Sequence, residues 1–108
     1  IMVTIGGSEA IDAAMRAMLD PGDEVLIPQP SYVSYVPCAV LAGAKPVIIP
    51  LKAENEFRLT AQELLDAITE KTKILILPYP NNPTGALYSK EILEEIVKVA
   101  EEFADKSR

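Results

Sequence analysis

Length, composition and charge set the first limits on this protein. Its 108 residues are 49% hydrophobic and 24% charged, a composition typical of one small globular domain and not of a disordered tail. The formal net charge of −6 argues against a nucleic-acid partner, because phosphate backbones favour basic faces. With no histidine and one cysteine, Cys38, we expect no zinc site, no Ser-His-Asp triad and no disulfide framework.

The apolar runs of the sequence are short. None is long enough to span a membrane, and no secretory signal pattern is found. These features predict a soluble, cytoplasmic protein that binds no membrane.

The first half of the chain alternates apolar runs with helical patterns. Residues 1–5 are a β-branched apolar run typical of a buried strand, and Ser8 can cap a helix that stops at residues 20–23. Residues 25–27 predict a second strand, and residues 34–41 predict a second helix.

The second half continues this alternation. It predicts strands at residues 46–50 and 74–77 and helices at residues 60–68 and 89–103. A polar loop at residues 52–58 precedes the first of these helices, and a turn-rich loop at residues 78–87 precedes the last. Thr60 and Glu63 form a capping box at the start of the third helix, and Ser89 caps the last helix.

Strands that are apolar on both faces indicate a parallel sheet covered by helices, so the expected fold class is α/β. Right-handed crossovers bring the loops that follow parallel strands to one edge of the sheet. Three unusual loops meet there, at residues 6–8, 29–32 and 79–85. Ligands bind at this carboxyl edge in open α/β sheets, so these loops are the candidate site.

Each loop has a structural and a functional interpretation. Residues 6–8 (Gly-Gly-Ser) are either a tight turn with a helix cap or a phosphate site built from free amides and the Ser8 hydroxyl. Tyr32 either fills the helix–sheet interface with Tyr35 or stacks on a planar ligand. Residues 80–85 (Pro-Asn-Asn-Pro-Thr-Gly) are either a rigid turn or a source of carboxamide hydrogen bonds.

Several motifs in register resemble one family. Residues 82–85 (Asn-Pro-Thr-Gly) are similar to the signature loop of the fold-type I, pyridoxal-phosphate-dependent aminotransferases of class I/II. The strings VTIGGSEA at residues 3–10, DPGDEV at 20–25 and PSYVSY at 30–35 agree with that family in order and spacing. The resemblance covers essentially the whole chain and is nearest to the aspartate/aromatic aminotransferase branch.

The resemblance implies a fold, a cofactor and binding residues. Residues 1–108 would be part of the large domain that binds pyridoxal 5′-phosphate, a segment of a longer chain. Its mostly parallel sheet would place the second strand between the third and the fourth. Gly7, Ser8 and the Glu9 amide would hold the cofactor phosphate. Tyr32 would stack on the pyridine ring, and Asn82 would donate a hydrogen bond to its phenolic oxygen.

The resemblance also implies the transfer of an amino group between an amino acid and a 2-oxo acid, in a cytoplasmic homodimer. The family's Schiff-base lysine, its aspartate beside the pyridine nitrogen and its substrate arginines lie further along the chain. None of the seven lysines here matches the lysine motif, so we expect no catalytic residue within this segment. The peptide bonds before Pro30 and Pro83 match positions that are often cis in the family, whereas Pro78 replaces an asparagine of many relatives.

Other interpretations stay open at this point. A related pyridoxal-phosphate lyase, decarboxylase or synthase would share the signature loop, and the 108 residues could act alone as a non-catalytic α/β module. With the family's strand order, residues 1–5 would also lack a neighbouring strand within the segment.

Overall fold

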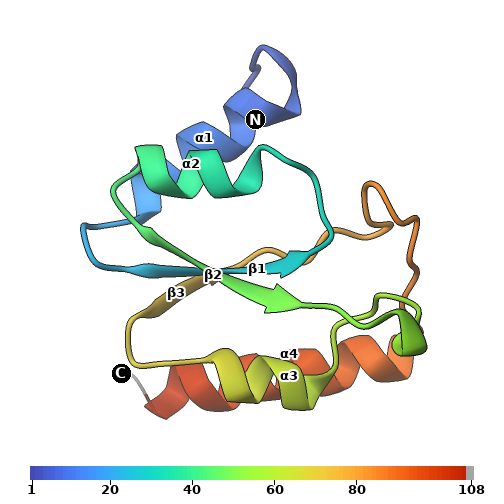
Figure 1. Ribbon diagram of the computed structural model, residues 1–108. Helices are drawn as coiled ribbons and strands as arrows, with labels where there is room; N and C mark the ends of the chain where they lie inside the picture. Colours follow the sequence, from blue (N-terminus) through green and yellow to red (C-terminus); the bar gives the residue numbers. More distant parts are fainter. Residues whose placement is uncertain (107–108) are drawn as a thin grey trace.

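Three parallel strands lie between two pairs of helices in this computed structural model, which describes residues 1–106 (Figure 1). In chain order the elements are α1 (Gly6–Met18), β1 (Glu24–Gln29), α2 (Tyr35–Leu41), β2 (Lys45–Pro50), η1 (Ala53–Asn55), α3 (Ala61–Ala67), β3 (Thr72–Leu75) and α4 (Lys90–Lys106). The sheet order is β2-β1-β3, so the predicted position of the second strand between the third and the fourth is confirmed.

The central strand β1 is buried on both faces because its side chains alternate between two cores. Val25 and Ile27 pack with α1 and α2, whereas Leu26 packs with α3 and α4. All three side chains have 0% exposure. Figure 1 shows the two helix pairs on opposite faces of the sheet, which confirms the expected α/β class.

Prolines within the strands occupy positions that need no backbone donor. The Lys45 amide donates to the Asp23 carbonyl, and the Leu51 amide donates to the Gln29 carbonyl, at 2.8 Å each. Odd-numbered residues of this segment therefore pair with β1. Pro46 and Pro50 therefore face the outer edge of the sheet. Pro28 of β1 lies beyond the last residue that pairs with β3.

Local caps begin the third and fourth helices as predicted. The Glu63 amide donates to Thr60 Oγ1 and the Thr60 amide donates to the Glu63 carboxylate, each at 3.1 Å, so the capping box is complete. The Ile92 amide donates to Ser89 Oγ at 3.3 Å. Within residues 1–106 each helix falls short of the length and apolar character that crossing a bilayer requires.

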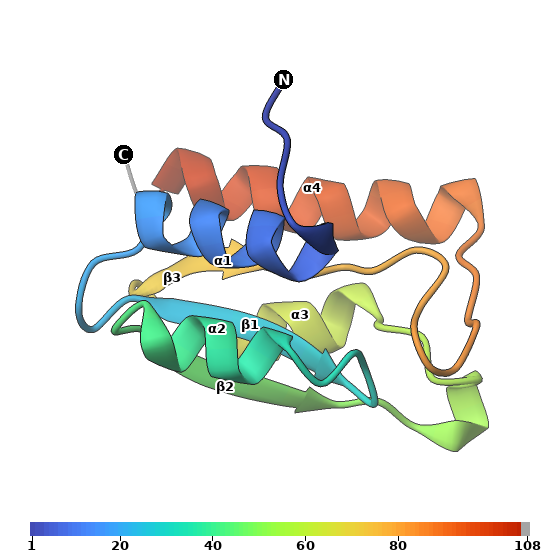
Figure 2. The same cartoon turned by 90° about the horizontal axis from the view of Figure 1, so that it is seen from above.

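The strand predicted at residues 1–5 is wrong. Residues 1–4 have no regular secondary structure, and Ile1, Met2, Val3 and Ile5 are exposed. Figure 2 shows this segment projecting away from the sheet. An apolar run becomes a strand only where a neighbour satisfies its backbone groups, and no described strand lies beside this one.

Several predicted element boundaries differ from the structure by a few residues, and two of these differences have a structural consequence. The last strand is Thr72–Leu75, two residues earlier than predicted. Helix α1 begins at Gly6, so Ser8 does not cap it. Gly6 has φ +71°, which a glycine adopts without steric cost and which turns the chain into the helix before Ser8 is reached.

Candidate functional site

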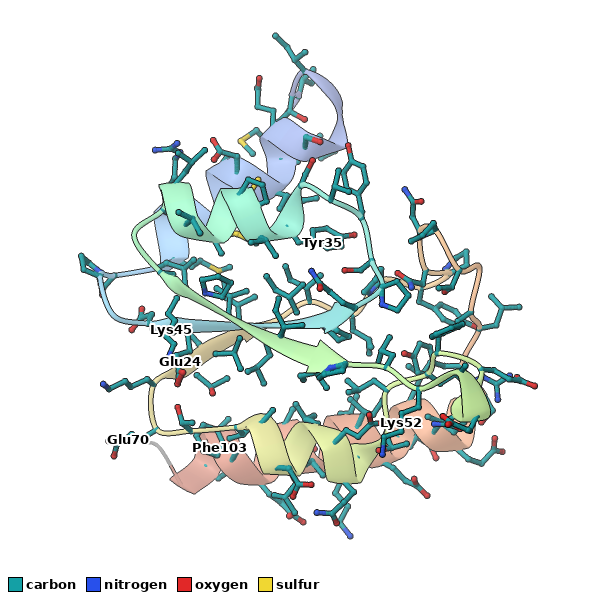
Figure 3. The ribbon with its side chains drawn as sticks, in the orientation of Figure 1. Glu24, Tyr35, Lys45, Lys52, Glu70 and Phe103 are labelled. Atoms are coloured by element: carbon teal, nitrogen blue, oxygen red, sulfur yellow. The ribbon has the colours of Figure 1, made fainter. Side chains whose placement is uncertain are left out.

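Three loops meet at the carboxyl edge of the sheet, and two hydrogen bonds join them. The hydroxyl oxygens of Ser8 and Tyr32 lie 3.2 Å apart, which connects the start of α1 to the turn after β1. Asn81 Nδ2 donates to the carbonyl oxygen of Pro30 at 2.8 Å, which connects the loop after β3 to the same turn. The predicted meeting of these loops is therefore confirmed. Tyr35, the first residue of α2, lies on the side of that helix that faces the sheet, while Glu24, Lys45 and Glu70 lie at the opposite end of the sheet (Figure 3).

The first turn of α1 presents free amide groups. No side chain caps this helix, so the amides of Gly7 and Ser8 have no partner inside it. A Cβ atom added at Gly7 would meet no heavy atom within 4 Å, so the space beside this residue is open. Such a helix start favours an anion, since both the amides and the helix dipole attract negative charge. Glu9 is exposed, and as the fourth helical residue its amide is the first that the helix can pair internally.

Tyr32 has contacts that fit both of its interpretations. Its ring meets the Tyr35 ring edge to face, with centroids 5.8 Å apart and an interplanar angle of 83°. Hydrogen bonds with the side chains of Ser34 and Ser8 lower the pKa of the Tyr32 hydroxyl. Burial, and to a smaller extent the nearby Tyr32, raises the pKa of Tyr35. Tyr32 is only half-buried, so part of its surface is open to a ligand.

The loop at residues 81–86 is closed by its own hydrogen bonds. The Gly85 amide donates to the Asn81 carbonyl at 2.8 Å, and the Asn81 amide donates to the Ala86 carbonyl at 3.2 Å. Asn82 lies within this closed loop; its side chain is exposed and forms no hydrogen bond with any residue in 1–106. Its carboxamide is therefore available to a ligand.

Three peptide bonds in these loops are cis. They precede Pro30, Pro80 and Pro83. The first and the third confirm what the family resemblance implied, whereas the bond before Pro80 was not predicted.

Two buried polar atoms at the junction of the loops have no hydrogen-bond partner among residues 1–106. They are Ser31 Oγ and Asn81 Oδ1. Ser31 follows Pro30 in the chain, and Asn81 itself forms the hydrogen bond to Pro30. Buried polar atoms are nearly always hydrogen-bonded, so this junction is suited to a further polar group. The sequence pointed to Asn82, but it gave no sign that the neighbouring Asn81 would be buried.

Comparison with known proteins identifies the family. The sequence model described as Aminotransferase class I and II matches residues 1–104. This chain belongs to that family. It is 51% identical over 102 residues to the aspartate aminotransferase of Pyrococcus abyssi, over 94% of this chain and 26% of that protein.

Two further relatives extend the comparison. The chain is 49% identical over 102 residues to aromatic-amino-acid aminotransferase 2 of Thermococcus litoralis, over 94% of this chain and 26% of that protein. It superposes with a TM-score of 0.91, at 47% identity, on the crystal structure of an aromatic aminotransferase from Pyrococcus horikoshii, over 95% of this chain and 28% of that chain. The chain thus spans about a quarter of the length of these aminotransferases.

Proposed function

We propose that the protein carrying this chain is a pyridoxal-phosphate-dependent aminotransferase, and that residues 1–108 are part of its cofactor-binding large domain. The contact between Ser8 and Tyr32 carries this proposal, because it puts an anion-binding helix start beside an aromatic ring. Pyridoxal phosphate has a phosphate group and a planar aromatic ring in one small molecule. Membership of the aminotransferase family supports the same conclusion.

The residues at the carboxyl edge fit this cofactor on three observations. The helix start has free amides beside open space at Gly7, the Tyr32 ring is partly open, and the Asn82 carboxamide has no partner within residues 1–106. In our proposal Gly7 and Ser8 bind the phosphate, with the Glu9 amide as a weaker third donor. Tyr32 stacks on the ring, and Asn82 donates a hydrogen bond to the phenolic oxygen, which lowers the proton affinity of that oxygen.

When bound, the cofactor supplies an electron sink for the α-carbon of the amino acid. The described residues bind and orient it. The seven lysines of the chain match no Schiff-base motif, so we place that lysine, the aspartate and the substrate arginines in the rest of the full-length protein. In the same proposal the substrates are an amino acid and a 2-oxo acid, and the enzyme is a cytoplasmic homodimer.

Spectroscopy and product analysis of the full-length protein test this proposal. We expect a visible absorbance band of bound pyridoxal phosphate that shifts with pH and disappears on reduction with borohydride. We also expect a 2-oxo acid to be formed from the amino acid, in step with amination of the acceptor. Release of carbon dioxide instead would indicate a decarboxylase, and release of ammonia would indicate a lyase. Absence of the band after incubation with the cofactor would contradict the proposal.

A further inference from the structure

We propose that Asn81 is a positioning residue that sets the placement of Asn82 relative to Tyr32. This inference rests on the proposed function, in which both of those residues contact the cofactor. Asn81 itself would contact neither the substrate nor the reacting atoms.

The side chain of Asn81 joins two loops through one nitrogen atom. Nδ2 donates to the Pro30 carbonyl at 2.8 Å and to Thr84 Oγ1 at 2.9 Å, so both of its hydrogens are used. Pro30 precedes Tyr32 by two residues, and Asn81 directly precedes Asn82. A single primary amide therefore holds the turn after β1 against the loop after β3.

Burial makes these bonds selective for asparagine. Asn81 is 8% exposed, one of only two polar or charged residues in the buried class among the described residues. A buried donor that loses its acceptor has no water to replace it, so alternative placements of the two loops are disfavoured. Aspartate and serine lack an NH₂ group, and glutamine would extend the amide by one methylene group.

The backbone of the loop is closed independently of this side chain. The amide and carbonyl of Asn81 bond to Ala86 and Gly85, and the Ala86 amide also donates to Thr84 Oγ1 at 3.2 Å. A truncated side chain at position 81 would leave these backbone bonds in place. We therefore expect Asn81→Ala to fold, with the loop displaced relative to Tyr32 and not unravelled.

The test uses the full-length protein and five forms: wild type, Asn81→Ala, Asn82→Ala, Thr84→Val and a control, Asn55→Ala. Asn55 is a matched control because its Nδ2 also donates to a backbone carbonyl, that of Arg58 at 3.2 Å, within a separate loop. For each form we would measure the dissociation constant of pyridoxal phosphate, the pH midpoint of its visible band and the melting temperature without cofactor.

For Asn81→Ala we expect the dissociation constant to rise about tenfold, the loss that corresponds to one buried hydrogen bond. The pH midpoint should move by up to about one unit, in the same direction as for Asn82→Ala. Thr84→Val removes one of the two acceptors, so both changes should be smaller but of the same sign. Asn55→Ala should leave both quantities at the wild-type values.

A merely structural role predicts a different result. If Asn81→Ala lowers the melting temperature but leaves the midpoint and the dissociation constant unchanged, the positioning role is overturned. If Asn81→Ala does not fold, Thr84→Val decides between the same two outcomes. A wild-type protein with no pyridoxal phosphate band would overturn the proposed function itself. A wild-type band that responds to Asn82→Ala but not to Asn81→Ala would overturn only this inference.

Discussion

The hydroxyl groups of Ser8 and Tyr32 lie 3.2 Å apart although 24 residues separate them in the chain. This contact joins the start of α1 to the turn after β1, where the central strand ends. It also gives the Ser8 hydroxyl a partner other than the backbone of its own helix. The candidate site is thus held together by a side-chain pair that no local pattern specifies.

Truncation of Tyr32 tests whether its ring binds the cofactor. In the full-length protein we expect Tyr32→Ala to raise the dissociation constant of pyridoxal phosphate about threefold to tenfold, the range of one aromatic stacking contact. Tyr32→Phe retains the ring but loses the contact with Ser8, so it should give a smaller loss. Absorbance titration measures both. Wild-type affinity in Tyr32→Ala would mean that Tyr32 only fills the interface with Tyr35.

Tyr32, in the turn before α2, and Tyr35, the first residue of α2, should ionise in a fixed order. Hydrogen bonds from Ser34 and Ser8 lower the pKa of Tyr32, whereas burial raises that of Tyr35. As the pH rises towards the ordinary tyrosine pKa of about 10, Tyr32 should therefore lose its proton first. Ultraviolet titration of phenolate absorbance in Tyr32→Phe and Tyr35→Phe assigns the two steps. The reverse order would contradict the hydrogen bonding described for Tyr32.

Substitutions at the adjacent glycines Gly6 and Gly7 distinguish effects on cofactor binding from effects on folding. At Gly7 an added Cβ meets no atom within 4 Å, and the residue lies in a helix, so Gly7→Ala should stabilise the fold by about 0.5–1 kcal/mol. The same methyl group occupies the space proposed for the phosphate, so cofactor affinity should fall.

The neighbouring substitution has the opposite effect on folding. Gly6 has φ +71°, and Gly6→Ala should cost about 1–2 kcal/mol of unfolding free energy. Chemical denaturation and cofactor titration of both variants check the pair. Unchanged cofactor affinity in Gly7→Ala would argue against a phosphate at this helix start.

Asn82→Ala removes the proposed donor to the phenolic oxygen of the cofactor. Without that donor the deprotonated form of the oxygen is less stable, and the proton is bound more strongly. The pH midpoint of the visible band should therefore rise by up to about one unit. Absorbance spectra collected across a pH series give the midpoint. Because Asn82 is exposed and unbonded within residues 1–106, the melting temperature without cofactor should not change. A midpoint equal to that of the wild type would reject the role.

Adjacent leucines on α3 test the packing of the sheet. Leu64 is 1% exposed in the core shared with Leu26, whereas Leu65 is 55% exposed. Leu64→Ala should lower the free energy of unfolding by about 2–5 kcal/mol, because it leaves a cavity. Leu65→Ala should change it by about 0.5 kcal/mol or less. Equal losses from denaturant titrations would show that α3 packs through another face.

The parts of the fold that the sequence predicted correctly are those decided by neighbouring residues. The capping box of Thr60 and Glu63 closes within four residues, and the alternating burial of Val25, Leu26 and Ile27 follows from the strand itself. The strand at residues 1–5 was predicted wrongly because its formation depends on a neighbour from elsewhere, and none lies beside it in the described chain.

The candidate site shows the same division. The three loops and their common edge follow from strand order, and Gly7, Ser8, Tyr32 and Asn82 all lie there. The Ser8 cap was predicted wrongly because the helix already begins at Gly6, whose positive φ turns the chain before Ser8 is reached. The contact of the Ser8 hydroxyl with Tyr32 depends on a residue 24 positions away. The burial of Asn81 also depends on a distant group, since the bond from Asn81 to Pro30 joins residues 51 positions apart. Spacing along the chain carries no signal for contacts of this length.

The most direct test of the aminotransferase proposal is to locate the cofactor on the full-length protein. After reduction with borohydride, peptide mass spectrometry should find the pyridoxyl group on one lysine that is none of the seven in residues 1–108. The reduced protein should also lose its transaminase activity. A pyridoxyl group on one of these seven lysines, or on no lysine at all, would contradict the proposal.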